Sequence, residues 1–340
     1  FVWVGTEIGL NRFDGYQFQN YIQGSPERFL SSSNIRKLIT LDRQRLAIVT
    51  SNGFQVLNTK DFAIQHYLIP DSSAFVTIRN RVWDLKELND GSFGVTTSSG
   101  FYVFHQDGSL LFRHDAYGLK DIGNKRIFYG RNIFSLPGNE MLIYVQVRDL
   151  AHFDIDKRVY QAVPDAAPAW KNFIHPTEAE GGPWISKTQI SDHTYIFLPR
   201  KDSLIYVDYK QQKRVASLMP FNCNDEFSWE SNVTMLDDST FAINGRYTGF
   251  YLFQLDRGTG NIRCHPEKYL GSLKINSLFQ DKDHRLWAGT TQGLLQQKVN
   301  EKFIRKHHWA VDDFSNMGYV DGLMLGDKLY LGRHSRDAGL

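Results

Sequence analysis

The sequence predicts an all-β protein, a seven-bladed β-propeller of four-stranded antiparallel blades. The first observation is a motif, apolar-Trp-x-Gly-Thr-x-x-Gly-Leu, that occurs at Val2–Leu10 and again at Leu286–Leu294. The second is that weaker copies recur between these two and once after them, at steps of 43 to 54 residues. The third is that no helical periodicity longer than a turn or two interrupts the series. Together they indicate about seven repeats of one β-rich unit.

Each repeat is expected to supply four short strands in the same order. A stretch upstream of the motif, such as Ile35–Asp42, forms the first strand, and the motif itself forms the second. The residues after the motif glycine alternate, as in Phe54–Leu57, and an edge-like stretch such as Phe62–Tyr67 follows. Four short strands joined by glycine or polar turns are typical of a propeller blade. The residues at the Trp position of successive copies are Trp3, Ala47, Gly94, Leu142, Ile196, Ala242, Trp287 and Tyr330.

The motif residues are interpreted as structural. Trp3 and Trp287 hold the same position in strand-like segments, which suits aromatic filler between adjacent blades. In five copies a glycine follows a pair of mostly polar residues, where a tight hairpin would demand a positive φ. We therefore expect hairpins here and not a phosphate-binding loop. These glycines are Gly9, Gly53, Gly100, Gly249 and Gly293.

At these residues the sequence resembles the two-component regulator propeller repeat. That family's repeat runs Asp-x-x-Gly-x-Leu-Trp-Ile-Gly-Thr-x-x-Gly-Leu and is often followed by Asn-Arg-Tyr-Asp-Gly. Residues Trp3–Gly15 match the opening repeat of such proteins, and Asp281–Leu294 matches a later one. The copies near Leu142 and Ile196 have drifted furthest from the pattern.

The resemblance implies the N-terminal propeller of the periplasmic sensor domain of a hybrid two-component system of the Bacteroides type. In that family a second propeller, a small β-sandwich, an inner-membrane span and cytoplasmic kinase and regulator modules follow. The resemblance also implies a polysaccharide-derived oligosaccharide ligand, signalling by rearrangement against neighbouring domains, and a homodimer in the full-length receptor. No cofactor is expected.

The two ends of the chain leave two alternatives open. Residues 1–310 are assigned to the propeller, but Phe1 begins at a second strand, so the first blade lacks its innermost strand. Either residues upstream supply that strand, or the segment Val320–Leu325 closes the ring. Residues 311–340 are accordingly either closing strands or the start of a second propeller.

Cationic and aromatic side chains gather at one predicted end of the blades. The hairpin after the second strand and the link to the next blade open on the same face. Arginine pairs with carboxylate or sulfate, and aromatic rings stack on sugars, so an acidic oligosaccharide would suit this face. The alternative is that surface loops carry arginine in any case, offset by Glu7, Asp149 and Asp202. The predicted ligand-binding residues are Arg81, Arg148, Arg200, Lys201, Trp229, Arg246, Tyr247, Arg333 and His334, and the links add Arg79, Arg131, Lys187, Trp170 and Trp184.

Catalytic and metal motifs are absent from the sequence. It contains no Gly-x-Ser-x-Gly elbow, no His-Glu-x-x-His, no phosphate loop and no zinc spacing of cysteine and histidine. Asp281-x-Asp283 and Asp154-x-Asp156 are interpreted as turns, since neither has the remaining ligands of a calcium site. The domain is therefore predicted not to be an enzyme. A propeller-fold glycosidase or polysaccharide lyase and a protein-interaction scaffold are the alternatives.

Three further features bear on partners. The net charge of +2 and the lack of a Lys/Arg run predict no nucleic-acid partner. Cys223 and Cys264, the two cysteines of the chain, suit either a disulfide or two separate buried thiols. The proline-rich insertion Gln161–Pro183 is either a lid, an interface with the second propeller, or plain loop variability.

Overall fold

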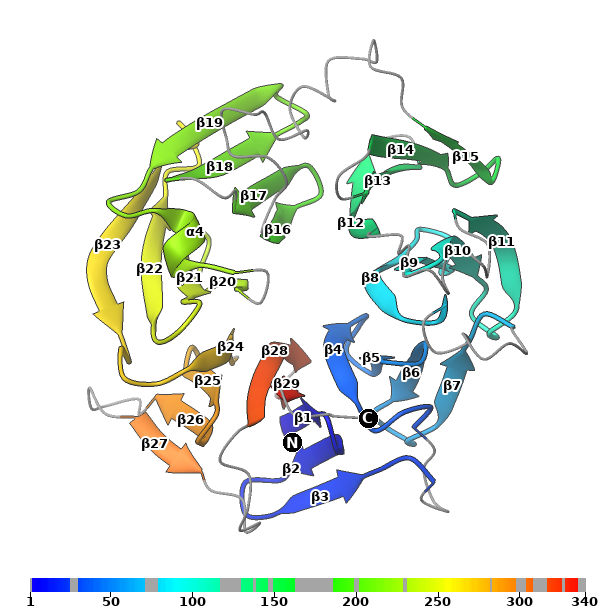
Figure 1. Ribbon diagram of the computed structural model, residues 1–340, viewed down its shortest axis with the longest axis horizontal. Coiled ribbons are helices and arrows are strands. Elements are labelled where there is room, and N and C mark those ends of the chain that lie inside the picture. The colour runs from blue at the N-terminus through cyan, green and yellow to red at the C-terminus, as the bar shows by residue number, and fades with distance from the viewer. Residues whose placement is uncertain are drawn as a thin grey trace. The chain divides into compact units, whose positions relative to one another are not determined.

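The chain forms a seven-bladed β-propeller with four-stranded antiparallel blades, as the repeat predicts (Figure 1). The structure is a computed structural model, and strands dominate its described part. Among those residues no helix has the length and apolar character that crossing a membrane requires. The structure describes residues 2–24, 30–70, 79–116, 130–136, 139–145, 149–162, 186–198, 202–228, 231–281, 283–297, 304–307, 317–325 and 328–335.

The chain divides into two compact units. The first comprises Phe1–Ile22, Ser33–Arg43 and Pro176–Leu340, and the second comprises Gln23–Ser32 and Gln44–His175. The first unit contains the blades β16 (Ser186–Ser191), β17 (Thr194–Leu198), β18 (Ser203–Asp208), β19 (Lys213–Leu218); β20 (Val233–Met235), β21 (Thr240–Asn244), β22 (Phe250–Leu255), β23 (Ile262–Tyr269); and β24 (Ile275–Gln280), β25 (Leu286–Thr290), β26 (Gly293–Gln297), β27 (Ile304–His307), with the short helix α4 (Cys223–Glu226) before β20.

The second unit contains two blades whose strands all lie within it. They are β8 (Val82–Glu87), β9 (Phe93–Thr97), β10 (Gly100–Phe104), β11 (Leu110–Asp115), and β12 (Gly130–Leu136), β13 (Glu140–Val145), β14 (Asp149–Asp154), β15 (Val159–Ala162). A further sheet has the order β4 (Ile35–Thr40), β5 (Arg45–Thr50), β6 (Phe54–Asn58), β7 (Ile64–Tyr67).

The seventh sheet joins strands from the two ends of the sequence. Its order is β28 (Met317–Leu325), β29 (Lys328–Ser335), β1 (Val2–Thr6), β2 (Gly9–Phe13), β3 (Phe18–Tyr21), so it has five strands (Figure 1). Strand β29 runs parallel to β1 and pairs Tyr330 with Trp3. These two residues hold the Trp position of their repeats, so equivalent strands lie side by side in register. The domain boundary at residue 310 stays a prediction.

The threonine of the motif explains the tight hairpin of three copies. The hydroxyl of Thr6 donates to the carbonyl oxygen of Gly9 at 2.8 Å, and the N–H of Ile8 donates to that hydroxyl. The same two bonds recur at Thr50 and Thr290. All three threonines are buried. The motif thus supplies its own side-chain partner for the turn between the second and third strands.

The motif glycines mostly adopt the predicted conformation. The φ angles of Gly9, Gly53, Gly249 and Gly293 are 135°, 79°, 67° and 121°. The prediction is wrong at Gly100, which has no positive φ. Gly100 is constrained by close approach alone, because a Cβ atom there would lie 1.9 Å from the carbonyl oxygen of His114. Close approach of the outer strand, and not turn geometry, requires glycine at this copy.

The motif tryptophans fill the core, as predicted. Trp3 is 1 % exposed and Trp287 is 6 % exposed. Trp287 packs in a cluster that includes Phe279 of its own blade and Val4 and Phe13 of the sheet that contains β1. An aromatic side chain between adjacent sheets buries apolar surface that neither sheet could cover alone.

The two cysteines are both free. Cys223 is buried and Cys264 is partly buried, and both belong to the apolar cluster that includes Phe227 and Phe253. Burial raises the pKa of the Cys223 thiol to about 12 and that of Cys264 to about 11. This arrangement corresponds to the alternative of two separate buried thiols. Residues 163–183, most of the predicted insertion, lie outside the described part of the chain.

Candidate ligand-binding surface

The hairpin after the second strand and the links between blades meet at one end of a blade. The N–H of Gly53 donates to the carbonyl oxygen of Asn80, and that of Gly249 to Leu273, at 2.8 and 2.7 Å. In each pair the first residue lies in a hairpin and the second lies in the following link. Hairpin and link therefore form one surface, which is where the sequence places the candidate residues.

Three predicted ligand-binding residues have described side chains, namely Arg81, Arg246 and Tyr247. Arg333 and His334 lie on β29, and Arg131 and Lys187 lie on β12 and β16, with only their backbone described. The others fall outside the described residues: Arg148, Arg200, Lys201, Trp170, Trp184 and Trp229.

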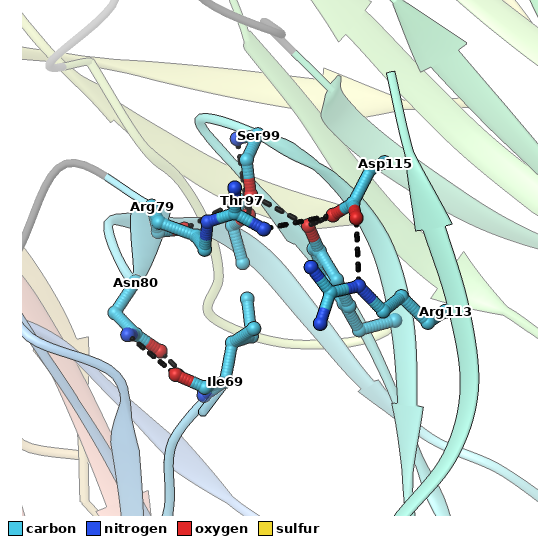
Figure 2. Close-up of polar contacts among 8 residues, drawn as sticks. Ile69, Arg79, Asn80, Thr97, Ser99, Arg113 and Asp115 are labelled. Atoms are coloured by element: carbon cyan, nitrogen blue, oxygen red, sulfur yellow. Dashed lines mark hydrogen bonds and ion pairs between the residues drawn. The ribbon is translucent and has the colours of Figure 1, made fainter. Parts of the chain in front are cut away.

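Arg79 lies in the link before β8, and its side chain is buried. Its side chain is 5 % exposed and its Nη1 atom lies 3.2 Å from Oδ1 of Asp115, at the end of β11. Arg113 approaches the same carboxylate through Nε at 2.7 Å, but its side chain is 43 % exposed. Figure 2 shows the two guanidinium groups converging on Asp115. One carboxylate thus joins the link to the outer strand of the blade.

A chain of hydroxyl groups continues from this carboxylate into the hairpin. The hydroxyl of Tyr102 donates to Asp115, and it lies 2.6 Å from Oγ of Ser99, which lies 3.1 Å from Oγ1 of Thr97 (Figure 2). Burial and the bond to Asp115 raise the pKa of Tyr102 above its ordinary value. Tyr102 therefore stays protonated and donates, and the network orders the hairpin end of the blade.

Arg81 and Trp83 contact the same hairpin through Ser98, next to Ser99 of this network. Arg81 is exposed, and its guanidinium carbon lies 6.0 Å from the ring centroid of Trp83. The indole N–H of Trp83 donates to Oγ of Ser98 at 3.1 Å, and the N–H of Ser98 donates to the carbonyl oxygen of Arg81. The hairpin therefore holds both the backbone of Arg81 and the ring of Trp83 in place.

A second cation–aromatic pair lies on the hairpin between β21 and β22. The guanidinium carbon of Arg246 lies 5.2 Å from the ring centroid of Tyr247, and Tyr247 is 64 % exposed. The N–H of Arg246 donates to the carbonyl oxygen of Glu226, at the end of α4, at 2.6 Å. This hydrogen bond therefore joins the hairpin to the link before β20.

Two lysines that the sequence reasoning missed lie beside this pair. The ammonium of Lys274 donates to the carbonyl oxygen of Arg246. Lys268 Nζ lies 2.9 Å from Oε2 of Glu226 and 5.3 Å from the ring centroid of Tyr251. Burial, together with a hydrogen bond to Glu226, raises the pKa of Tyr251 above its ordinary value.

The repeat register carries a signal that would have found Asp115 and Lys268. The third strand pairs with the end of the fourth, as Gly100 with Asp115 and Tyr251 with Lys268. The last residues of each outer strand therefore lie next to the hairpin, although 14 or more residues separate them in sequence. Within the described residues, no group of acidic, histidine or cysteine side chains is arranged to hold a metal ion.

Comparison with known proteins supports both the fold and the repeat. Residues 269–292 match the family model of the two-component regulator propeller. No curated protein matches the chain.

Two solved structures similar to this chain are of the extracellular domain of BT4673 from B. thetaiotaomicron. BT4673 is described as a putative one-component system for one of these structures and as a putative hybrid two-component system for the other. Their sequence identity is 14 %, with TM-scores of 0.58 and 0.60. Each match covers 94 % of this chain but 39 % of that domain, so the chain spans well under half of its length.

The β-propeller domain of Cps50 (Swd1) from Myceliophteria thermophila is also similar. Its TM-score is 0.57 at 10 % identity, and the match covers 85 % of this chain and 89 % of that one. At such identities the structural likenesses show the fold alone. The predicted family resemblance is confirmed over the matched segment: residues 269–292 match the model of the two-component regulator propeller, and the chain that contains them is a seven-bladed β-propeller.

Proposed function

We propose that this chain is the ligand-sensing propeller of a hybrid two-component receptor and binds an oligosaccharide released from a polysaccharide. The observation that carries the proposal is the exposed ring of Tyr247 with Arg246 beside it, on a hairpin fixed to the link below. An aromatic face packs on the C–H face of a sugar, and guanidinium N–H groups donate to its hydroxyl or acidic groups. Arg81 and Trp83 repeat this chemistry on another blade.

The match at residues 269–292 supports the assignment to a signalling receptor. The similar domain of BT4673 is extracellular and much longer than this chain. By analogy we place the propeller on the periplasmic side of an inner-membrane protein, next to a second propeller of the same chain. The receptor is a homodimer in this proposal, and ligand binding rearranges the propeller against its neighbouring domains.

Binding of oligosaccharides by the whole chain tests the proposal directly. Isothermal titration calorimetry with neutral and acidic oligosaccharides from plant and host polysaccharides should identify at least one ligand. Tyr247→Ala should then weaken binding roughly tenfold, since truncating an aromatic contact residue commonly costs more than 1 kcal/mol.

Tyr16 provides a matched control. It is 97 % exposed, and it lies on a turn that Asp14 closes with its own side chain. Tyr16→Ala should leave affinity unchanged. Absence of any glycan binding, or equal losses in the two variants, would contradict the proposal. Release of shortened products by the isolated chain would replace it with the enzyme alternative.

A further inference from the structure

Strand β8 carries a β-bulge at Trp83, at the hairpin end of its blade. Val82 pairs with Thr97 and Asp84 pairs with Thr96, so Trp83 is an extra residue between two consecutive pairs. Thr97 is the last residue of β9, which places the bulge beside the hairpin that follows β9. Bulges redirect a side chain and are over-represented next to functional sites. The bulge therefore marks the ring of Trp83 as a candidate for contact with a ligand.

The contacts around the bulge fix the position of the Trp83 ring. Its indole N–H donates to Oγ of Ser98 at 3.1 Å, and Ser98 is fully buried. On the other side of the bulge, the N–H of Asp84 donates to Oγ1 of Thr96 at 3.1 Å, and Oδ2 of Asp84 accepts the N–H of Ile133 at 2.8 Å. Trp83 is partly exposed. Because its N–H group is already engaged, what the ring offers a ligand is an apolar surface in a fixed orientation.

Arg81 brings a guanidinium group to this ring. The residue is exposed, and among the described residues its guanidinium makes no hydrogen bond or ion pair; its contact is with the ring of Trp83, 6.0 Å from the centroid. Asp115, the carboxylate joined to the same link, binds Arg79 and Arg113 instead. A guanidinium has five N–H donors in a rigid fork that matches the oxygens of a carboxylate. Arg81 therefore has donors available for an anionic ligand.

One hairpin residue holds Arg81 and Trp83 together. Ser98 accepts the indole N–H of Trp83, and its own N–H donates to the carbonyl oxygen of Arg81 at 2.9 Å. The backbone that carries the cation and the aromatic ring are thus both fixed before a ligand arrives. Groups ordered in advance lose less conformational entropy on binding.

We infer that Arg81 and Trp83 form a subsite for a sugar residue that bears a carboxylate or a sulfate group. The ring of Trp83 packs on the C–H face of the sugar, and Arg81 donates a pair of hydrogen bonds to two oxygens of the acidic group. The inference rests on the proposed sensing function and narrows its ligand from oligosaccharides in general to acidic ones.

The experiment uses the whole chain and compares sugars with and without the acidic group. Calorimetry with trigalacturonic acid against its methyl ester, and with a chondroitin sulfate tetrasaccharide against its desulfated form, separates carboxylate from sulfate recognition. One acidic ligand should bind at least about tenfold more tightly than its matched partner, the difference typical of a charge-assisted hydrogen bond. Arg81→Gln should remove most of that difference, leave binding of the matched partner unchanged, and unfold at the same temperature as the unsubstituted chain.

Arg263 supplies the matched control. It is an exposed arginine on the outer strand β23, and its guanidinium likewise makes no ion pair within the part of the chain that the structure describes. Arg263→Gln removes the same charge but should leave the preference for the acidic ligand intact. Equal effects of the two substitutions would reduce the preference to general electrostatics and overturn the subsite.

The outcomes separate this inference from the function on which it rests. If only neutral oligosaccharides bind, or if the two members of each pair bind equally, the sensing function stands and the Arg81–Trp83 subsite is wrong. The subsite is also wrong if an acidic ligand is preferred and Arg81→Gln keeps the whole preference. If no oligosaccharide of the broad panel binds, the sensing function itself fails, and the subsite fails with it.

Discussion

The indole N–H of Trp287 donates a hydrogen bond to Oδ2 of Asp281 at 2.8 Å, inside the repeat that matches the family model. The same carboxylate accepts the backbone N–H groups of Asp283 and Arg285 and the Nε–H of Arg285. The aspartate and the tryptophan of the repeat are therefore one structural unit. The carboxylate of Asp281 accepts hydrogen bonds from the turn before β25, and it also accepts the indole N–H of Trp287, which β25 buries.

Asp281→Ala should destabilise the propeller by about 1–3 kcal/mol, because it leaves the buried indole N–H of Trp287 without this acceptor and unties the turn. Urea unfolding monitored by tryptophan fluorescence measures the loss. Asp283→Ala is the control, since Asp283 is half-exposed and bonds through its side chain to the outer part of Arg285. The control should cost less than about 1 kcal/mol, and a cost equal to that of Asp281→Ala would contradict the structural unit.

The stability of the propeller should also depend on pH through Asp281. Burial opposes ionisation of this carboxyl, but hydrogen bonds from Trp287 and Arg285 outweigh it and hold its pKa below the ordinary value of 3.8. A lowered pKa in the folded state means that the carboxylate's contribution is fully present above pH 3.8 and is lost as pH falls through the folded-state pKa. The difference in unfolding free energy between the native chain and Asp281→Asn should therefore be constant from pH 5 to 7 and shrink below about pH 4. A difference independent of pH down to 2.5 would contradict the assignment.

Arg79 and Arg113 provide a buried and an exposed partner for one carboxylate. Arg79→Met should cost about 2–4 kcal/mol, because it removes the buried guanidinium that neutralises Asp115. Arg113→Met should cost less than about 1 kcal/mol, since its side chain is 43 % exposed and solvent screens the pair. Thermal and urea unfolding of the two variants, and of each combined with Asp115→Asn, give the two coupling energies. Equal coupling energies would show that burial does not distinguish the two ion pairs.

Comparing Gly53 with Gly15 separates two reasons for a glycine: a positive φ, and the close approach of another strand. Both have a positive φ, 79° and 103°, but a Cβ at Gly53 would lie 2.5 Å from the carbonyl oxygen of Tyr67, whereas none of the surrounding atoms lies within 4 Å at Gly15. Gly15→Ala should therefore cost about 1–2 kcal/mol, the cost of the conformation alone. Gly53→Ala should cost at least about 1 kcal/mol more, because the outer strand has to shift. Equal losses in unfolding free energy would mean that the outer strand moves freely away from the hairpin.

The repeat was sufficient to predict the fold because its residues act locally. Thr6 and Gly9 close a hairpin with each other, and Asp281 binds groups within six residues of itself. Contacts of such short range leave a recurring trace in the sequence. The same locality explains the error at Gly100, where the constraint comes from His114 on the outer strand and not from the turn.

The candidate site was predictable only in part. Arg81, Arg246 and Tyr247 were found because hairpins and links have fixed places in the repeat. Asp115, Lys268 and Lys274 were not found, because each contacts a residue 28 to 42 positions away in sequence: Asp115 contacts Arg79, Lys268 contacts Glu226 and Lys274 contacts Arg246. The pairing of the outer strand with the third strand places Asp115 and Lys268 beside the hairpin, a signal that lies in the register of the repeat, whereas Lys274 lies in the link before β24.

The sequence by itself determined the repeat, its four strands, the hairpin chemistry and the family to which the matched segment points. Only the tertiary structure decided which cations are buried in ion pairs and which lie at the surface. Arg79 is buried against Asp115 and serves the fold, whereas the side chain of Arg113, which contacts the same carboxylate, is 43 % exposed. The physical reason is that periodicity reports where a side chain leaves the backbone, while the effect of its charge depends on burial and on the partner that folding brings to it.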